Sequence, residues 1–244
     1  MNRLNIFLSF TSIFLAVSLE PAFAGPPFIT DDPQTVDLGH WEFYVSSQMD
    51  FTHNDVDITA PQIEVNYGAA QDVQLHIITP LGYVKTEAGK AYGYKDTEAG
   101  VKIRLINTED GLMVGIFPIA EFPTGVKSNQ LGNGKTQLYL PAWIQKSWGK
   151  LQTYGGLGYW INPGTGNKNY VFAGWQAQYD FSSAFTLGGE VYYKSRDSQD
   201  AVNSAGFNLG GNININGLHH ILFSFGKLIS LTSYTGYLGY QLTI

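Results

Sequence analysis

The fold is decided by the last eight residues of the chain, Tyr237-Leu238-Gly239-Tyr240-Gln241-Leu242-Thr243-Ile244. Large apolar side chains at 238, 240, 242 and 244 alternate with smaller or more polar ones, which is the period of a strand with one apolar face. A free strand edge at a chain terminus invites aggregation in a soluble protein, whereas in a barrel it pairs with the first strand. This ending predicts an outer-membrane β-barrel, although such barrels usually end on an aromatic residue rather than on Ile244.

The first 24 residues predict a cleaved secretory signal peptide. Arg3 supplies a positive n-region, residues 4–17 form an apolar h-region, and Ala22-Phe23-Ala24 is a small-x-small site with cleavage expected before Gly25. The alternative is a transmembrane anchor, but the apolar run is shorter than the roughly 20 residues that span a bilayer. Because the sequence has no cysteine, we expect neither a lipoprotein anchor nor a disulfide framework.

The composition of the remaining chain favours strands. The sequence contains 28 glycines and 14% aromatic residues, whereas a helical soluble protein would be richer in Leu, Ala, Glu and Lys and poorer in Gly. The net charge of −6 and the lack of a basic patch argue against a nucleic-acid partner. We expect three parts: the leader 1–24, an extended Pro-rich segment 25–39, and one barrel domain 40–244.

Period-two alternation marks twelve candidate strands. In the fourth of them, apolar residues from Ala99 to Leu105 alternate with Glu98, Lys102 and Arg104, so one face is apolar and the other is charged. Apolar outside and polar inside is the order that a bilayer imposes on a barrel. The sequence therefore predicts an all-β fold, a transmembrane antiparallel up-and-down β-barrel of about 12 strands. The strands are expected at about 40–49, 58–67, 73–83, 94–106, 112–122, 137–147, 151–161, 170–179, 185–194, 205–215, 220–228 and 233–244.

The connections between these strands alternate in length. Short ones follow the even-numbered strands and longer ones follow most odd-numbered strands, including 84–93 and 123–136. This is typical of periplasmic turns and extracellular loops in a barrel with both termini in the periplasm, and a soluble β-sandwich has no reason to show it. Aromatic residues near strand ends suit two interfacial girdles. They are Trp41, Tyr67, Tyr83, Trp143, Trp148, Trp160, Tyr170, Trp175, Tyr179 and Tyr240.

Several motifs in one order carry a family resemblance across essentially the whole mature chain. They are residues 25–33 (GPPFITDDP), 39–42 (GHWE), 96–102 (DTEAGVK), 121–125 (EFPTG), 140–146 (LPAWIQK), 154–164 (YGGLGYWINPG) and 206–211 (GFNLGG). With these motifs the chain resembles the outer-membrane family named for the MetA-pathway of phenol degradation. The resemblance implies a transporter-like barrel for small aromatic compounds, and it carries over no reaction and no site residues.

The polar faces of the strands supply the candidate lumen residues. In a narrow lumen unpaired carboxylates are costly, so we expect Lys102 and Arg104 to bridge Glu98, Glu64 or Glu121 on neighbouring strands. Two interpretations stay open: a polar constriction that selects solutes, and a salt-bridged filling that only holds the barrel together. The candidates are Glu42, Glu64, His76, Glu98, Lys102, Arg104, Glu121, Tyr154, Glu190 and Lys194.

The strand 112–122 is apolar on both faces until Glu121. Such a stretch fits either a slide for aromatic or hydrophobic solutes or a surface covered by an inserted loop or by the N-terminal segment. The sequence does not tell whether residues 25–39 fill the lumen or lie in the periplasm. Pro118 lacks a backbone donor, so a bulge or local break is expected there.

Three function classes follow from this sequence. The leading one is an outer-membrane channel or transporter for small solutes, with a weak cation preference because acids outnumber bases in the predicted lumen. The second is a structural or surface-binding barrel whose loop 123–136 meets a partner. The third is a lipid-modifying enzyme, for which the only candidate catalytic residues are Ser195-Arg196-Asp197 with His53.

We expect no enzyme activity, no cofactor and no metal. There is no Gly-x-Ser-x-Gly elbow, and Gly132-Asn133-Gly134-Lys135-Thr136 lacks the earlier glycine of a phosphate-binding loop. The pair Asp31-Asp32 lacks the spacing of a calcium site and is interpreted as a solvated turn. The expected partners are outer-membrane lipid, the barrel-assembly machinery through the C-terminal strand, and a small-molecule solute.

Overall fold

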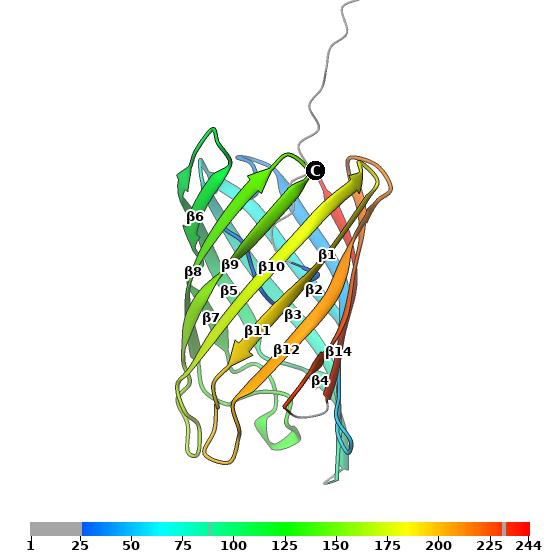
Figure 1. Ribbon diagram of the computed structural model, residues 1–244. Coiled ribbons are helices and arrows are strands. Elements are labelled where there is room, and N and C mark those ends of the chain that lie inside the picture. Colours follow the sequence, from blue (N-terminus) through cyan, green and yellow to red (C-terminus); the bar gives the residue numbers. More distant parts are fainter. Residues whose placement is uncertain (1–25, 88, 231–232) are drawn as a thin grey trace, which may run out of the picture.

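A single antiparallel sheet closes on itself to form a barrel (Figure 1). The computed structural model describes residues 26–87, 89–230 and 233–244, so the predicted leader lies outside the described residues. The strands are β1 (Trp41–Phe51), β2 (Val56–Ala70), β3 (Val73–Thr86), β4 (Gly89–Tyr94), β5 (Thr97–Asn107), β6 (Leu112–Ile116), β7 (Ile119–Phe122), β8 (Gln137–Trp148), β9 (Leu151–Ile161), β10 (Tyr170–Ser182), β11 (Phe185–Lys194), β12 (Ser204–Asn214), β13 (His219–Leu228) and β14 (Ser233–Thr243).

These fourteen strand segments occupy twelve positions around the barrel wall, because two positions are each built from two successive segments. Each position is called a stave below. Lys95 and Asp96 separate β4 from β5 in one stave, and Phe117 and Pro118 separate β6 from β7 in another. The break predicted at Pro118 is therefore present. β14 pairs with β1 from Thr243 opposite Glu42 to Tyr234 opposite Phe51, which closes the sheet and confirms the predicted fold class.

The stretch 84–93 was predicted as a loop, and this prediction is wrong. β3 continues to Thr86 and pairs with β4 in a hairpin whose last paired residues are Thr86 and Gly89, the latter with φ of 137°. The hairpin extends beyond the rest of the barrel wall in Figure 1. A glycine that tolerates positive φ lets the chain reverse in a tight turn, so a strand hairpin forms where only length had suggested a loop.

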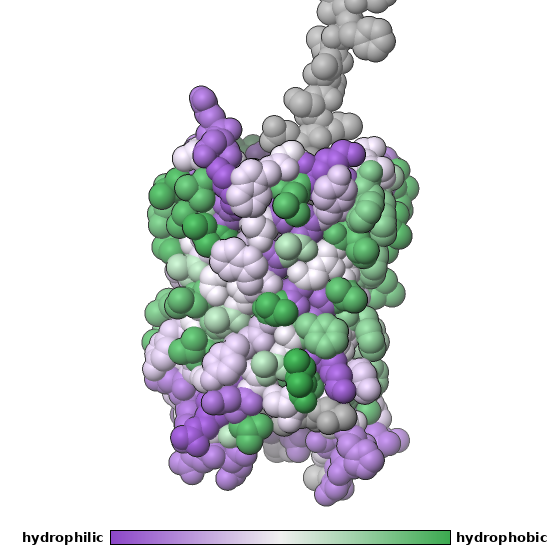
Figure 2. All heavy atoms as spheres, in the orientation of Figure 1, coloured by the Kyte–Doolittle hydropathy of each residue, from purple (hydrophilic) through white to green (hydrophobic). Residues whose placement is uncertain are grey.

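Side chains alternate between the two sides of the wall. Large apolar residues such as Leu140, Leu157 and Leu209 are exposed on the outer surface, and Figure 2 shows hydrophobic residues over the wall with hydrophilic ones gathered at both ends. Trp143, assigned above to a girdle, is only 2% exposed and lies in the lumen. The reason is that Trp143 is separated from the buried Tyr139 and Gln145 by an even number of positions on the same strand, so all three side chains point inward.

The two ends of the barrel differ. The short-turn end carries the tight connections, such as that between Trp148 and Leu151, together with the C-terminus (Figure 1). The long-loop end carries the connection 123–136, which includes a 3-10 helix at Lys127–Asn129. Among the described residues no helix is long and apolar enough to cross a membrane.

Candidate functional site

The N-terminal segment lies inside the barrel, and residues 26–38 are called the plug below. Figure 1 shows this dark blue start of the described chain within the lumen. Its strongest anchor is the Glu190 carboxylate of β11, which accepts hydrogen bonds from Ile29 N at 2.9 Å and Thr30 N at 2.8 Å. Asn208 Nδ2 of β12 donates to the same carboxylate at 2.6 Å. Charge-assisted bonds of this kind are about twice as strong as neutral ones, so Glu190 fixes the plug backbone.

Three further strands hold the plug. Lys102 Nζ of β5 lies 2.9 Å from Asp31 Oδ1, and the Val36 amide donates to Gln74 Oε1 of β3 at 2.9 Å. On the opposite wall Ser224 Oγ of β13 donates to the carbonyl oxygen of Pro27 at 2.6 Å. The plug is thus tied to strands on several sides of the lumen.

Glycines in the wall make room for the plug. A Cβ at Gly174 of β10 would stand 2.1 Å from Thr30 Oγ1, and one at Gly115 of β6 would stand 3.0 Å from the Pro33 Cβ. Real Cβ atoms essentially never show the first distance and rarely show the second, so the plug and the lumen-facing glycines fit each other. This also answers in part why the strand 112–122 is apolar on both faces: its Gly115 is covered by the N-terminal segment.

The predicted bridges of Lys102 and Arg104 to lumen carboxylates are wrong. Lys102 pairs with Asp31 of the plug, and Arg104 pairs with Asp72 of the β2–β3 turn at 2.6 Å. The interpretation of Asp31-Asp32 as a solvated turn is wrong as well, because Asp32 has no exposed surface. The physical reason is the position of the plug, which brings a carboxylate to Lys102 from inside the barrel.

A cavity of about 540 Å³ remains inside the lumen, on the side of the plug toward the long-loop end. Phe28 and Ile29 of the plug line it on one side, and residues 130–133 of the long loop line it on another. Asp96 anchors that loop, because its carboxylate accepts hydrogen bonds from Gly125 N at 2.8 Å and Asn133 N at 2.6 Å. The loop therefore folds into the mouth of the barrel, with Leu131 buried.

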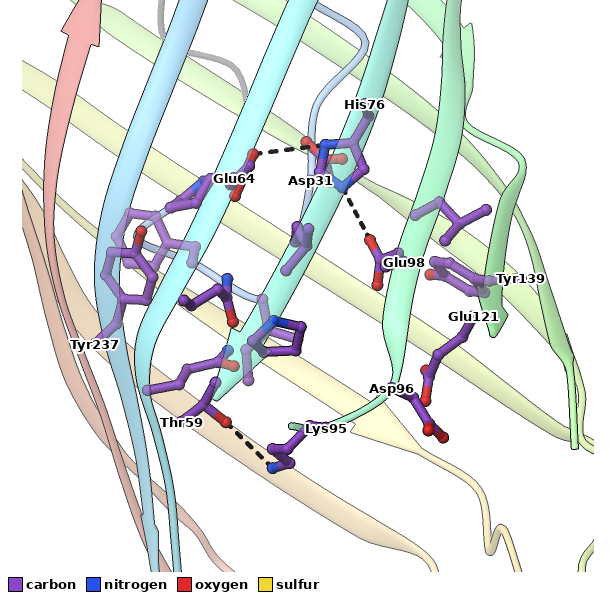
Figure 3. Close-up of a pocket in the computed structure, with 18 of the residues that line it drawn as sticks. Asp31, Thr59, Glu64, His76, Lys95, Asp96, Glu98, Glu121, Tyr139 and Tyr237 are labelled. Atoms are coloured by element: carbon purple, nitrogen blue, oxygen red, sulfur yellow. Dashed lines mark hydrogen bonds and ion pairs between the residues drawn. The ribbon is translucent and has the colours of Figure 1, made fainter. Parts of the chain in front are cut away.

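One wall of the cavity is polar and comes from β2, β3 and β5 (Figure 3). His76 stands between two carboxylates: its Nδ1 is 3.6 Å from Glu64 Oε1 and its Nε2 is 3.0 Å from Glu98 Oε1. Nδ1 also contacts Asn66 Oδ1 at 2.6 Å. Glu121 of β7 sits directly opposite Glu98 in the register and carries no hydrogen bond or ion pair among the described residues.

The adjoining wall is aromatic and comes from β6 to β10. Tyr139 stacks on Trp160 with centroids 4.7 Å apart, and Trp160 stacks in turn on Tyr170 at 5.6 Å. Phe172 meets Trp143 edge to face at 6.4 Å. The Phe117 and Ile119 side chains of the interrupted stave continue this wall. An aromatic surface beside a row of carboxylates can hold a solute by stacking on its ring and by charge or hydrogen bonds to its polar group.

The predicted site residues lie in four places. Glu64, His76, Glu98, Lys102 and Glu121 line the cavity. Glu42, Tyr154 and Glu190 are buried within the lumen; Arg104 lies at the short-turn end; and Lys194 lies at the long-loop rim, 2.6 Å from Asp197 and over the Tyr170 ring.

Sequence reasoning missed the partner of Lys102 and most of the aromatic wall. Trp143, Phe172 and Trp160 had been assigned to girdles or left out of the lumen set. Parity along β8 would have found Trp143, because it shares a face with Tyr139. No local signal could have found Asp31, whose role depends on where the plug folds.

The residues considered for an enzyme are not assembled into a catalytic group. The Asp197 carboxylate pairs with Lys194, and Ser195 Oγ accepts a hydrogen bond from Val171 N at 2.9 Å. Within the described part of the chain neither contacts His53. In that same part, no three or more His, Asp and Glu side chains come together in a way that could hold a metal ion.

No family model and no curated protein matches the sequence, so the resemblance to the phenol-degradation family stays a prediction. Solved structures do match. An outer-membrane channel from Pseudomonas putida F1 superposes with a TM-score of 0.72 at 15% identity, over 87% of this chain and 98% of that one. The KdgM porin (0.59, 8%) and the NanC porin (0.57, 10%) each match over 82% of this chain and 98% of theirs. The chain therefore has the fold of outer-membrane channels and porins.

Proposed function

We propose that this chain is an outer-membrane channel for small solutes, exported by its leader and inserted in the bacterial outer membrane. The observation that carries the proposal is the cavity of about 540 Å³ inside a closed twelve-stave barrel. Its volume falls in the range of small-molecule sites, and its walls combine apolar surface with a few polar groups. The fold shared with outer-membrane channels supports the same conclusion.

The solutes we propose are small aromatic or hydrophobic compounds. The aromatic wall from Phe117 to Phe172 offers ring surface for them, and the resemblance to the phenol-degradation family points the same way. Because cavity-lining acids outnumber the two lysines, anionic solutes should be disfavoured and cations weakly preferred.

We infer that the lumen is blocked in this conformation. On the short-turn side of the cavity the plug and a layer of buried amides fill the lumen, with Gln145, Gln176 and Gln241 each at most 1% exposed. Gln176 Nε2 donates to Gln178 Oε1 at 2.8 Å, and Gln178 Nε2 donates to Gln152 Oε1 of β9 at 2.6 Å. A solute that enters the cavity can therefore cross only when the plug shifts away from Glu190 and Lys102.

The test is flux through liposomes that contain the refolded mature chain. We expect small neutral solutes, including phenol, to permeate faster than through protein-free liposomes, and phenol to alter single-channel currents in a planar bilayer. Loss of every flux signal, with the barrel shown to be folded, would overturn the proposal.

A barrel without transport is the second candidate, because the plug is held from several sides and the loop 123–136 is folded into the mouth. If this candidate is right, flux stays at the protein-free level even after the plug is removed. The loop can be trimmed in parallel, and a changed surface interaction would then favour the binding role.

A further inference from the structure

Two carboxylates stand opposite each other in the wall of the cavity. Glu98 of β5 and Glu121 of β7 are register partners in the antiparallel pair, and both line the cavity. Like charges directly opposite each other destabilise a strand pair. Glu98 has His76 as a partner at 3.0 Å, whereas Glu121 has none among the described residues. The arrangement costs stability in the empty protein.

Neither lysine that lines this cavity forms an ion pair with Glu121. Lys95 Nζ bonds to Asp57 at 2.8 Å and to Thr59 Oγ1 at 3.1 Å. Lys102 Nζ bonds to Asp31 of the plug. Within the described residues the two glutamates are therefore short of positive charge, and a cation supplied by a ligand would complete them.

An aromatic face adjoins the two glutamates. In the pairing of β7 with β8, Glu121 is opposite Gln137 and Ile119 is opposite Tyr139. Tyr139 therefore lies on the neighbouring strand, two residues from the one that Glu121 faces. Figure 3 shows Tyr139 on the same side of the cavity as Glu98 and Glu121, with Glu64 and Tyr237 on the other side. An ammonium group held against an aromatic ring and a carboxylate gains both cation–π and charge-assisted interactions.

The same cavity is lined by two further side chains that the body of a ligand can contact. Ile29 of the plug is 41% exposed although it is large and apolar, and it lines the cavity. Trp143 is 2% exposed and its Nε1 has no hydrogen-bond partner. A Cβ at Gly156 would stand 2.8 Å from the Cε3 atom of Trp143, so that edge of the indole faces β9 and the Nε1 edge is turned away from it. Ile29 and Trp143 thus offer apolar and aromatic surface to the body of a ligand in this cavity.

We propose that this cavity recognises a protonated organic amine with an aromatic or apolar body. The ammonium group lies between Glu98 and Glu121 and against Tyr139, and the body contacts Phe117, Trp143 and Ile29. The proposal rests on the solute-channel function above and names the class of solute. Binding is non-covalent, and the ligand leaves unchanged.

The test compares two probes that differ in charge and share a ring. Phenylethylamine is a cation at pH 7, and 2-phenylethanol is neutral with nearly the same shape. With the refolded mature chain in detergent, isothermal titration calorimetry should show the amine binding about tenfold more tightly, the size expected for one charge-assisted bond. Raising the salt concentration should weaken only the amine.

Variants assign the effect to these residues. In Glu121→Gln the preference for the amine should fall to about twofold or less, while the alcohol binds as before. The matched control is Glu109→Gln, which removes a carboxylate from an exposed turn at the other end of the barrel and should change neither probe. Tyr139→Phe should keep the preference, and Tyr139→Leu should reduce it several-fold.

Equal binding of the two probes to the unmodified chain would overturn the proposal, as would an equal loss of both in Glu121→Gln. Because the comparison of probes on the unmodified chain needs no variant, a folding defect in one variant does not leave the proposal undecided. Binding without any liposome flux would overturn the channel function alone. Flux of 2-phenylethanol without selective amine binding would overturn the amine proposal alone.

Discussion

The two halves of the lumen have opposite fillings although one set of strands builds both. Toward the short-turn end the inward positions carry amides such as Gln145, Gln176 and Gln241, which pack without exposed surface. Toward the long-loop end the inward positions carry aromatic rings and carboxylates around a cavity of about 540 Å³. The plug lies between the two. Alternation along each strand therefore decides which side chains face inward. The size of those side chains and their hydrogen-bond partners decide whether the lumen is filled.

Removing the plug should break this contrast most strongly. A mature chain that lacks residues 26–38 loses the contacts to Glu190, Lys102, Gln74 and Ser224, and its cavity becomes continuous with the space that the plug occupied. We expect steady single-channel conductance where the full chain is closed for most of the recording. A deletion variant as silent as the full chain would mean that the amide layer alone closes the barrel.

A methyl group at Gly174 should displace the plug without deleting it. The new Cβ would stand 2.1 Å from Thr30 Oγ1, so Gly174→Ala should lower the free energy of unfolding by about 1–3 kcal/mol. Urea unfolding followed by tryptophan fluorescence measures this. Gly236→Ala is the matched control, because its Cβ would have no neighbour closer than 3.8 Å. A similar loss of unfolding free energy at both positions would show that contact with Thr30 is not the cause.

Substituting Glu190→Gln should loosen the plug while keeping the side chain's shape. The amide replaces one acceptor of the Ile29 and Thr30 N–H groups with a donor, at a cost of about 1–3 kcal/mol. Since the sequence has no cysteine, a single Thr35→Cys placed in the plug reports its exposure through maleimide labelling. We expect labelling about tenfold faster with Glu190→Gln than without it. Unchanged labelling would show that the other anchors suffice.

Lys102 and Arg104 should differ in their effect on ion selectivity. Lys102→Ala removes a charge beside the cavity and leaves Asp31 unpaired, so the cation preference measured by reversal potential should strengthen. Arg104→Ala should strengthen it less, because Arg104 is bound to Asp72 at the short-turn end. Equal shifts would mean that both side chains line the ion path to the same degree.

The smallest effect is expected outside the lumen, at the β5–β6 turn. A hydrogen bond from Lys146 and one from Thr108 lower the pKa of Asp110 to about 2. A lowered carboxyl pKa gives stability that is present above the ordinary pKa near 4 and is lost as the pH falls toward 2. The pair is exposed, so Asp110→Asn should shift thermal unfolding only slightly, and only above pH 4. A large shift would indicate that this turn organises the barrel.

The strands could be predicted from the sequence because their signal is local. Each residue's side of the wall follows from its neighbours two positions away, and the last eight residues alone specify a strand that β1 completes. The break at Pro118 was equally local, since it follows from a missing N–H group. The hairpin of β3 and β4 was missed because a long connection and a strand hairpin differ little in composition.

The candidate site could be predicted only in part. Glu64, His76 and Glu98 were found as inward residues, and the structure joins them in one chain of contacts. Their grouping with Tyr139 and Trp160 depends on how the staves neighbour one another, and no pattern within a strand records that. The anchoring of the long loop by Asp96 also joins residues 29 and 37 positions apart.

The sequence by itself determined the class of fold, most of the inward and outward faces, and the acidic character of the lumen. Only the tertiary structure decided that residues 26–38 lie inside the barrel, that Lys102 pairs with Asp31, and that a cavity remains between them and the long-loop end. The bond from Thr30 to Glu190 spans 160 positions. Alternation along a strand is a property of adjacent residues, whereas the filling of an enclosed space depends on which distant segments fit it together.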